Sequence, residues 1–221
     1  MNSKSNSLPV ELSTEVLTVD PGSPDRAAAR RIVDVLNAGG IVAMRPDTVY
    51  GLLARVNRPE ALRRLAAIKQ RAADKPFLTL AGDWRAVRQL TSHLPPVARH
   101  LGSRYWPGPI TLILPGAKNL PAEISGPENT VGVRIPDEPF LLSILRELRG
   151  SVAAPSANLP GQPPLRTAQE SAKAFGNEID LFVEGGPPVR EAHSTVVSCV
   201  ELPAQVLREG ALELTALDLE S

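Results

Sequence analysis

Hydrophobic residues recur along the chain with two spacings, one typical of helices and the other typical of strands. In residues 23–40 the apolar positions are three or four residues apart and share one helical face: Ala29, Ile32, Val33 and Leu36. Ser23 is expected to cap this helix, Pro24 to occupy its first position and Gly39 to end it. The segment therefore has a clear helix signature.

Other segments alternate between helix and strand signals. A second helix is expected over residues 59–69, and four more are expected to begin at Asp83, at Pro95, after Asp137 and at Thr167. Short apolar runs predict strands at residues 14–19, 41–44, 76–80, 106–114, 130–136, 152–158, 181–184 and 194–200. Because several intervening gaps are short, we expect an α/β fold with a mixed, twisted sheet and flanking helices rather than a strictly parallel sheet.

The strand predicted over residues 130–136 has two different faces. Its period of two places Val131, Val133 and Ile135 towards the core and leaves Arg134 on the opposite, non-core face. Arg134 is either a solvated arginine or a group that captures a carboxylate or phosphate in a bidentate manner, a task that suits the planar guanidinium better than a lysine ammonium.

Composition and charge limit the classes of function. Hydrophobic residues at 43% and charged residues at 22% are ordinary for a globular protein, and 4% aromatic residues predict a mostly aliphatic core. Twenty-four basic and 24 acidic residues give a formal net charge of zero, so any anion site must be a local cluster of cations. The single Cys199 excludes an intrachain disulfide and a cysteine-rich metal cluster.

The sequence also gives an expectation for localisation. It has neither a signal peptide nor an apolar run of 18 residues, so the chain is expected to be cytoplasmic and not to engage a membrane.

Two polar segments interrupt the apolar pattern and carry candidate chemistry. Lys69, Arg71 and Lys75 lie within seven residues at the end of a predicted helix, where they either complement its dipole or neutralise phosphates. Neither GxxxxGK[ST] nor a strand-linked GxGxxG is present to hold phosphates in another way. Ser156 and Asn158 follow a small-residue strand, and they either offer a hydroxyl and an amide to a ligand or form a capped turn.

Seven segments, taken in order, resemble the Sua5/YciO/YrdC/YwlC family: RPDTVYGLLA, IKQRAADKPF, WPGPITLIL, TVGVRIPD, APSANLPGQPP, HSTVV and VLREG. The resemblance covers residues 23–212, which are expected to form one catalytic domain between an N-terminal extension at residues 1–22 and a C-terminal tail at residues 213–221. It implies a YrdC-like twisted sheet around a concave, positively charged cavity.

The activity that this resemblance implies is that of an L-threonylcarbamoyladenylate synthase, a nucleotidyltransferase. Such enzymes convert L-threonine, bicarbonate and ATP, with Mg²⁺ on the phosphates, into threonylcarbamoyl-AMP and pyrophosphate. Threonylcarbamoyl transferase proteins then use this product to modify tRNA. The chemistry needs positioning and charge neutralisation rather than a nucleophilic side chain.

The resemblance also implies residue roles, which match the cations and short polar groups of this chain. The positions expected to bind ATP are Lys69, Arg71, Lys75, Thr130, Ser156, Asn158 and Arg208, of which Lys69 and Arg71 are also expected to be catalytic. The positions expected to bind the amino acid are Pro46, Asp47, Thr48, Tyr50, Arg134 and Ser194. No protein-held metal site is expected.

Four positions depart from the family pattern. Arg45 and Pro46 stand where the family usually has Pro and Thr, and His193 stands where small residues are common. Because proline has neither a hydroxyl nor a backbone N–H, we hypothesise that threonine binds more weakly, with Thr48 compensating, or that the protein accepts another small amine or acid. His193 lies either near the amino-acid end of the cavity or in solvent, and Ala72, at a usual proline, removes no charge.

Two other functions compete with the synthase. One is an enzyme that uses ATP with a different amine or carbamoyl acceptor, and the other is a protein that binds tRNA or double-stranded RNA on its concave surface. The zero net charge and the few aromatic residues weigh against RNA binding as the main function.

Overall fold

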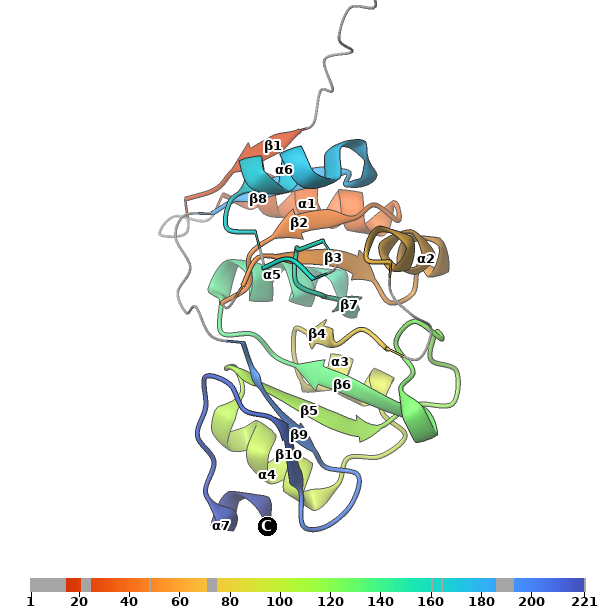
Figure 1. Cartoon of the computed structure of the whole chain (residues 1–221), viewed down its shortest axis with the longest axis vertical. Helices are drawn as coiled ribbons and strands as arrows, with labels where there is room; N and C mark the ends of the chain where they lie inside the picture. Colours follow the sequence, from red (N-terminus) through yellow and green to blue (C-terminus); the bar gives the residue numbers. More distant parts are fainter. Residues whose placement is uncertain are drawn as a thin grey trace, which may run out of the picture.

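The computed structural model describes residues 15–20, 25–47, 49–70, 75–159, 161–163, 165–185 and 193–220. The expectations for Ser23, Pro24, Thr48, Arg71 and Ala72 therefore lie outside the described residues. The described parts contain one ten-stranded sheet in the order β1-β8-β2-β3-β7-β4-β6-β5-β9-β10. Figure 1 shows the sheet running along the length of the molecule, with β1 near one end and the C-terminus at the other.

The sheet is mixed, as expected from the short gaps between elements. Its strands are β1 (Val16–Thr18), β2 (Val42–Met44), β3 (Gly51–Arg55), β4 (Thr79–Ala81), β5 (Ile110–Pro115), β6 (Thr130–Arg134), β7 (Ser151–Ala153), β8 (Leu181–Glu184), β9 (Thr195–Ser198) and β10 (Gln205–Arg208). The parallel pairs are β1 with β8, β2 with β8, β4 with β6 and β5 with β9. The other neighbours are antiparallel.

Helices flank the sheet on both sides (Figure 1). They are α1 (Arg26–Asn37), α2 (Pro59–Ile68), α3 (Trp84–Leu90), α4 (Pro96–Tyr105), α5 (Pro139–Leu148), α6 (Ala168–Phe175) and α7 (Ala216–Leu219), with short 3-10 turns at Pro127–Asn129 and Gly176–Glu178. The predicted starts of α3 and α4 at Asp83 and Pro95 are confirmed. The predicted cap of α1 is corrected, because the N-cap residue is Asp25, whose side chain accepts a hydrogen bond from the backbone N–H of Ala27 at 2.8 Å.

Successive residues of the central strands belong to two separate apolar cores. On β2, Val42 and Met44 belong to the core in which α1 and α5 pack against the sheet, whereas Ala43 belongs to the other core. Leu62 and Leu65 of α2 are part of that other core. Side chains of a strand alternate between its faces, so a short run that is apolar at every position predicts a strand buried on both faces.

Two strands and one helix were not expected from the sequence. β3 is buried at nearly every position and shows no alternation, while all four residues of β10 are exposed at the edge of the sheet. α7 lies beside α4, where the buried Asp218 accepts a hydrogen bond from Arg104 Nη1 at 2.8 Å (Figure 1). Among the described helices, none has the length and apolar character needed to cross a bilayer.

Candidate functional site

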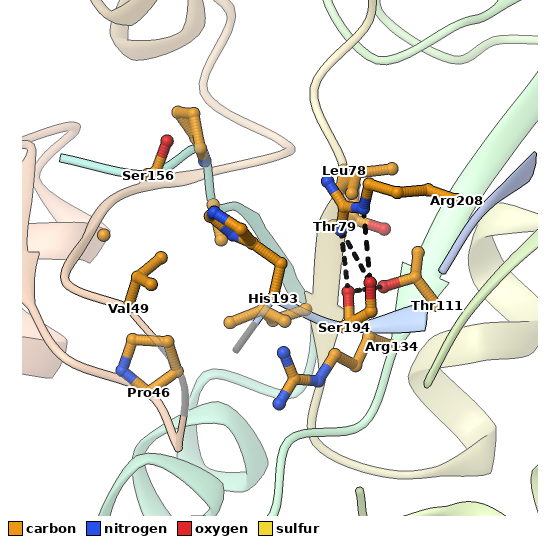
Figure 2. A pocket seen from close by; sticks show the side chains of 14 residues that line it. Pro46, Val49, Leu78, Thr79, Thr111, Arg134, Ser156, His193, Ser194 and Arg208 are labelled. Carbon is orange, nitrogen blue, oxygen red and sulfur yellow. Dashed lines mark hydrogen bonds between the residues drawn. The ribbon is translucent and has the colours of Figure 1, made fainter. Parts of the chain in front are cut away.

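A cavity of about 180 Å³ opens where several strands end or begin. β3, β4, β5, β6 and β10 contribute to its wall, together with the loops that follow β2 and β7 and the residues directly before β9. Five of the residues that the sequence assigns to ligand binding line it: Pro46, Arg134, Ser156, Ser194 and Arg208. These residues are far apart in the sequence, so only the fold brings them together (Figure 2).

Arg134 is the buried cation of the cavity. Its side chain is held from two sides, because its guanidinium forms an ion pair with Asp47 and its Nε donates a 2.9 Å hydrogen bond to the carbonyl of Gly108. Arg134 is 5% exposed and Asp47 is fully buried, so the solvated interpretation of Arg134 is wrong. The polar stretch that follows β2 thus supplies a buried counter-ion for an arginine on another strand.

Asp47 itself is only partly satisfied. Its Oδ1 pairs with Arg134, but its Oδ2 is buried and has no hydrogen-bond partner among the described residues. Asp47 does not line the cavity in the described part of the chain. Its contact with the candidate ligand is therefore indirect and runs through the position of Arg134.

A second group of polar side chains surrounds Ser194. The hydroxyls of Ser194 and Thr111 are 2.8 Å apart, and Arg208 Nη2 donates to the Ser194 carbonyl at 2.8 Å and to its hydroxyl at 3.2 Å (Figure 2). Burial lowers the pKa of the Arg208 guanidinium from its usual value. Ser194 is 6% exposed and Thr111 is 1% exposed, so their hydroxyls lie at the floor of the cavity, whereas Arg208 reaches them from the exposed edge strand β10.

The loop after β7 is tied to the end of α2. Lys69 Nζ donates hydrogen bonds to the Ser156 carbonyl at 2.9 Å, to Asn158 Oδ1 at 2.7 Å and to the Asn158 carbonyl. The Ser156 hydroxyl also donates to Asn158 Oδ1 at 2.7 Å, and Asn158 Nδ2 donates to the carbonyls of Leu159 and Gln162. The amide of Asn158 thus builds the turn, which is the structural alternative of the two that the sequence left open.

Three further predicted residues do not line the cavity. The Tyr50 hydroxyl is buried and donates to the Val183 carbonyl at 2.6 Å, and burial raises the pKa of this phenol. The Thr130 hydroxyl donates to the Pro127 carbonyl at 2.9 Å, and Lys75 is exposed. Tyr50 therefore anchors the loop that carries Pro46 and Asp47, whereas Thr130 and Lys75 are not among the described residues that line the cavity.

The structure adds polar groups that the sequence did not single out. Thr79 and Thr111 line the cavity, and so does His193, which the sequence left open between cavity and solvent. Both threonines interrupt otherwise apolar strands, and that interruption was the available signal. Burial, followed by the positive charge of Arg208, lowers the pKa of the His193 imidazole.

The described residues do not form a protein-held metal site. They contain no group of three or more His, Cys, Asp or Glu side chains that could hold an ion. No carboxylate is present among the described residues that line the cavity. Because Mg²⁺ selects oxygen ligands and is usually held by carboxylates, these residues do not fit a resident Mg²⁺ ion.

Comparison with known proteins gives the family. The Sua5/YciO/YrdC family model, described as telomere recombination, matches residues 34–210. The chain is 34% identical to the threonylcarbamoyl-AMP synthases of Pyrococcus abyssi and Bacillus subtilis, over 183 and 204 residues that cover 83% and 92% of this chain. It spans 54% and 57% of the length of these two relatives.

The fold agrees with the same family. The structure of Pyrococcus abyssi Sua5 in complex with L-threonine superimposes with a TM-score of 0.85 at 32% identity, over 90% of this chain and 58% of that one. The predicted α/β fold with a mixed, twisted sheet is confirmed by this likeness. The chain belongs to the Sua5/YciO/YrdC family.

Proposed function

We propose that this protein synthesises L-threonylcarbamoyl-AMP and pyrophosphate from L-threonine, bicarbonate and ATP. The observation that supports this most directly is the convergence of Arg134, Ser194 and Arg208 on one small cavity in a member of this family. The Pyrococcus abyssi relative of the same fold binds L-threonine. Threonylcarbamoyl transferase proteins that modify tRNA would receive the product.

The cavity has the size and polarity for an amino acid. At about 180 Å³ it is smaller than the roughly 300–1,000 Å³ pockets that enclose drug-sized ligands. The guanidinium groups of Arg134 and Arg208 suit the substrate carboxylate, and each charge-assisted hydrogen bond would contribute about 1.5–3 kcal/mol. The hydroxyls of Ser194 and Thr111 lie beside them.

ATP is assigned to the side of the cavity that carries Ser156. Lys69 places its ammonium at the loop that presents Ser156 to the cavity, so one cation already lies close to this side. Arg71 and Lys75 follow Lys69 in the chain and complete the proposed phosphate-binding set, together with Thr130 and Asn158. Lys69 and Arg71 would stabilise the negative charge that develops on the phosphates during transfer.

The proposed chemistry has two steps. The substrate amine attacks the carbon of CO₂ or bicarbonate to give a carbamate, and a carbamate oxygen then attacks the α-phosphorus of ATP while pyrophosphate leaves. The protein contributes position and charge neutralisation, since neither step needs a covalent bond to a side chain. The cations and short polar groups of the cavity are suited to that task.

Mg²⁺ would enter as part of the ATP substrate. Phosphate oxygens and water can supply its ligands, and this is how Mg²⁺ is commonly held in phosphoryl-transfer sites. The described cavity residues offer no carboxylate to replace them. The ion would therefore belong to the nucleotide rather than to the protein.

Pro46 gives a reason to test other amino acids. It lines the cavity next to Val49, so this part of the wall is apolar and offers no hydroxyl (Figure 2). A substrate hydroxyl that faced this wall would lose one hydrogen bond. The same enzyme chemistry with another small amino acid is therefore the second candidate function.

Pyrophosphate release by the purified protein tests the proposal. The assay contains ATP, Mg²⁺ and bicarbonate, with L-threonine or each of the other amino acids in turn. Threonine-dependent release is the expected result, and release that requires a different amino acid would favour the second candidate. Absence of amino-acid-dependent release, with ATP still bound, would refute both.

A further inference from the structure

His193 is the one imidazole among the described residues that line the cavity. The proposed function gives it no role in binding either the amino acid or ATP. It directly precedes Ser194, the residue whose hydroxyl and carbonyl are bound by Arg208. In Figure 2 its ring points away from Ser194 and Arg208, towards the side of the cavity that carries Val49 and Ser156. The imidazole therefore lies between the proposed amino-acid side and the proposed nucleotide side.

The reaction requires a proton acceptor at that place. An amino acid binds as an ammonium ion, whose nitrogen has no free electron pair, so it must lose a proton before it can attack carbon. Arg134 and Arg208 are permanent cations and accept no protons. No carboxylate lines the cavity within the described residues, so His193 is the one described lining group that titrates near neutral pH.

The surroundings keep the imidazole in its basic form. The charged side chains that line the cavity with it are Arg134 on β6 and Arg208 on β10, and both carry positive charge. Burial and the charge of Arg208 lower the pKa of His193 below its ordinary value of 6.5. The lowered pKa favours the unprotonated ring at neutral pH, and in this form the imidazole can accept a hydrogen bond from an ammonium group.

We infer that His193 is the general base that removes a proton from the ammonium group of the amino-acid substrate. This assignment rests on the proposed function. One ammonium proton moves to the imidazole, the nitrogen electron pair forms the C–N bond to bicarbonate, and the C–OH bond breaks. The second nitrogen proton leaves with that hydroxyl as water, so the products are the carbamate, water and the imidazolium ion, which then returns its proton to solvent.

The test compares pH profiles of pyrophosphate release by the full chain, its His193→Gln variant and a His100→Gln control. Glutamine keeps hydrogen-bonding groups but cannot take up a proton, and His100 lies on the exposed surface of α4, outside the cavity. The amino-acid substrate that supports release is varied at saturating ATP and bicarbonate, so that kcat and KM are obtained separately from pH 5 to 9. Binding of the same amino acid is measured by calorimetry.

For the unmodified protein, kcat should fall as the pH drops through the pKa of His193, because the protonated ring cannot accept a proton. His193→Gln should lower kcat at least tenfold at pH 7, and the deficit should shrink as rising pH deprotonates the amine without help. Its KM and binding constant should change less than threefold, and His100→Gln should stay within twofold of the unmodified protein.

Two results would overturn the assignment, and they differ from each other. A His193→Gln variant with unchanged kcat, or with a deficit that is the same at every pH, would show that the imidazole only shapes the cavity. Absence of amino-acid-dependent release by the unmodified protein would refute the proposed function and this assignment together.

Discussion

The pair of Arg134 and Asp47 is the most buried charged contact at the cavity. A buried ion pair is not strong evidence for stability, because desolvation offsets much of the attraction between the charges. Removal of one partner is different, since it leaves the other charge buried and uncompensated. The role that we assign to Asp47 is thus to compensate the buried charge of Arg134 and to hold its side chain in place at the cavity.

Asp47→Asn should destabilise the fold through this effect. We expect the free energy of unfolding, measured by urea titration, to fall by about 3–5 kcal/mol. The matched control is Glu60→Gln, which removes an exposed ion pair with Arg63 and should change stability by less than about 1 kcal/mol. Equal losses of unfolding free energy in the two variants would show that buried Arg134 does not need Asp47 for its contribution to stability.

Pro46→Thr tests whether the apolar wall weakens substrate binding. The threonine side chain would place a hydroxyl in the cavity, and one hydrogen bond to a charged ligand group contributes about 1.5–3 kcal/mol. Calorimetry should therefore show roughly tenfold to hundredfold tighter binding of L-threonine. ATP affinity is the internal control and should not change. The hypothesis of an altered pocket would be contradicted if the unmodified protein bound threonine tightly and the variant bound it no better.

At the scale of elements, the end of α2 controls the loop after β7. Lys69 lies at the C-cap of α2, where its charge also complements the helix dipole. Lys69 donates hydrogen bonds to Ser156 and Asn158, in a loop almost ninety residues away in the chain. Lys69 therefore both fixes the loop after β7 to the end of α2 and places a positive charge at the proposed phosphate-binding side of the cavity.

Lys69→Ala should lower kcat/KM for ATP at least tenfold, which is a loss of roughly 1.4 kcal/mol in transition-state stabilisation. The reason is the loss of both a cation and the contacts that position Ser156. Pyrophosphate release at varied ATP concentration is the measurement. The control is Lys173→Ala, which removes one charge from the exposed face of α6 and should leave the kinetics unchanged. Unchanged kinetics in Lys69→Ala would show that Lys69 does not act on the phosphates.

At the scale of the whole molecule, the C-terminal segment is attached to the fold through Asp218. This carboxylate is 1% exposed and accepts hydrogen bonds from Thr215, Tyr105 and Arg104. The bonds from Thr215 contribute most to lowering the pKa of Asp218 below its ordinary value of 3.8. The sequence of residues 213–221 gave no structural signal. The boundary expected between the catalytic domain and this tail, at residue 212, stays a prediction.

Because folding favours ionised Asp218, its contribution to stability is complete above pH 3.8 and is lost as the pH falls through the lower pKa of the folded state. Asp218→Asn should therefore lower the free energy of unfolding by about 1.5–3 kcal/mol at pH 7. The difference from the unmodified protein should shrink below pH 3.8. Denaturant titrations across pH measure it, with exposed Glu213→Gln as the control; a difference that did not depend on pH would rule out the ionised carboxylate as its source.

Local chemistry explains which elements were predictable. Helices such as α3 and α4 begin where a capping aspartate or a proline precedes an apolar face, and these signals act within a few residues. β10 was missed because all four of its residues are exposed, so burial leaves no pattern in its sequence. The α1 cap moved to Asp25 because several neighbouring residues can fulfil that role.

The sequence alone was sufficient to determine the α/β class, the mixed sheet and the family, because periodicity, caps and ordered motifs are properties of short segments. Only the tertiary structure decided which candidate side chains meet. It buried Arg134 against Asp47, used the Asn158 amide within its own turn, placed Tyr50 in the core and brought His193 into the cavity. Those outcomes depend on contacts between residues far apart in the chain, and on the burial that such contacts produce, which no local pattern records.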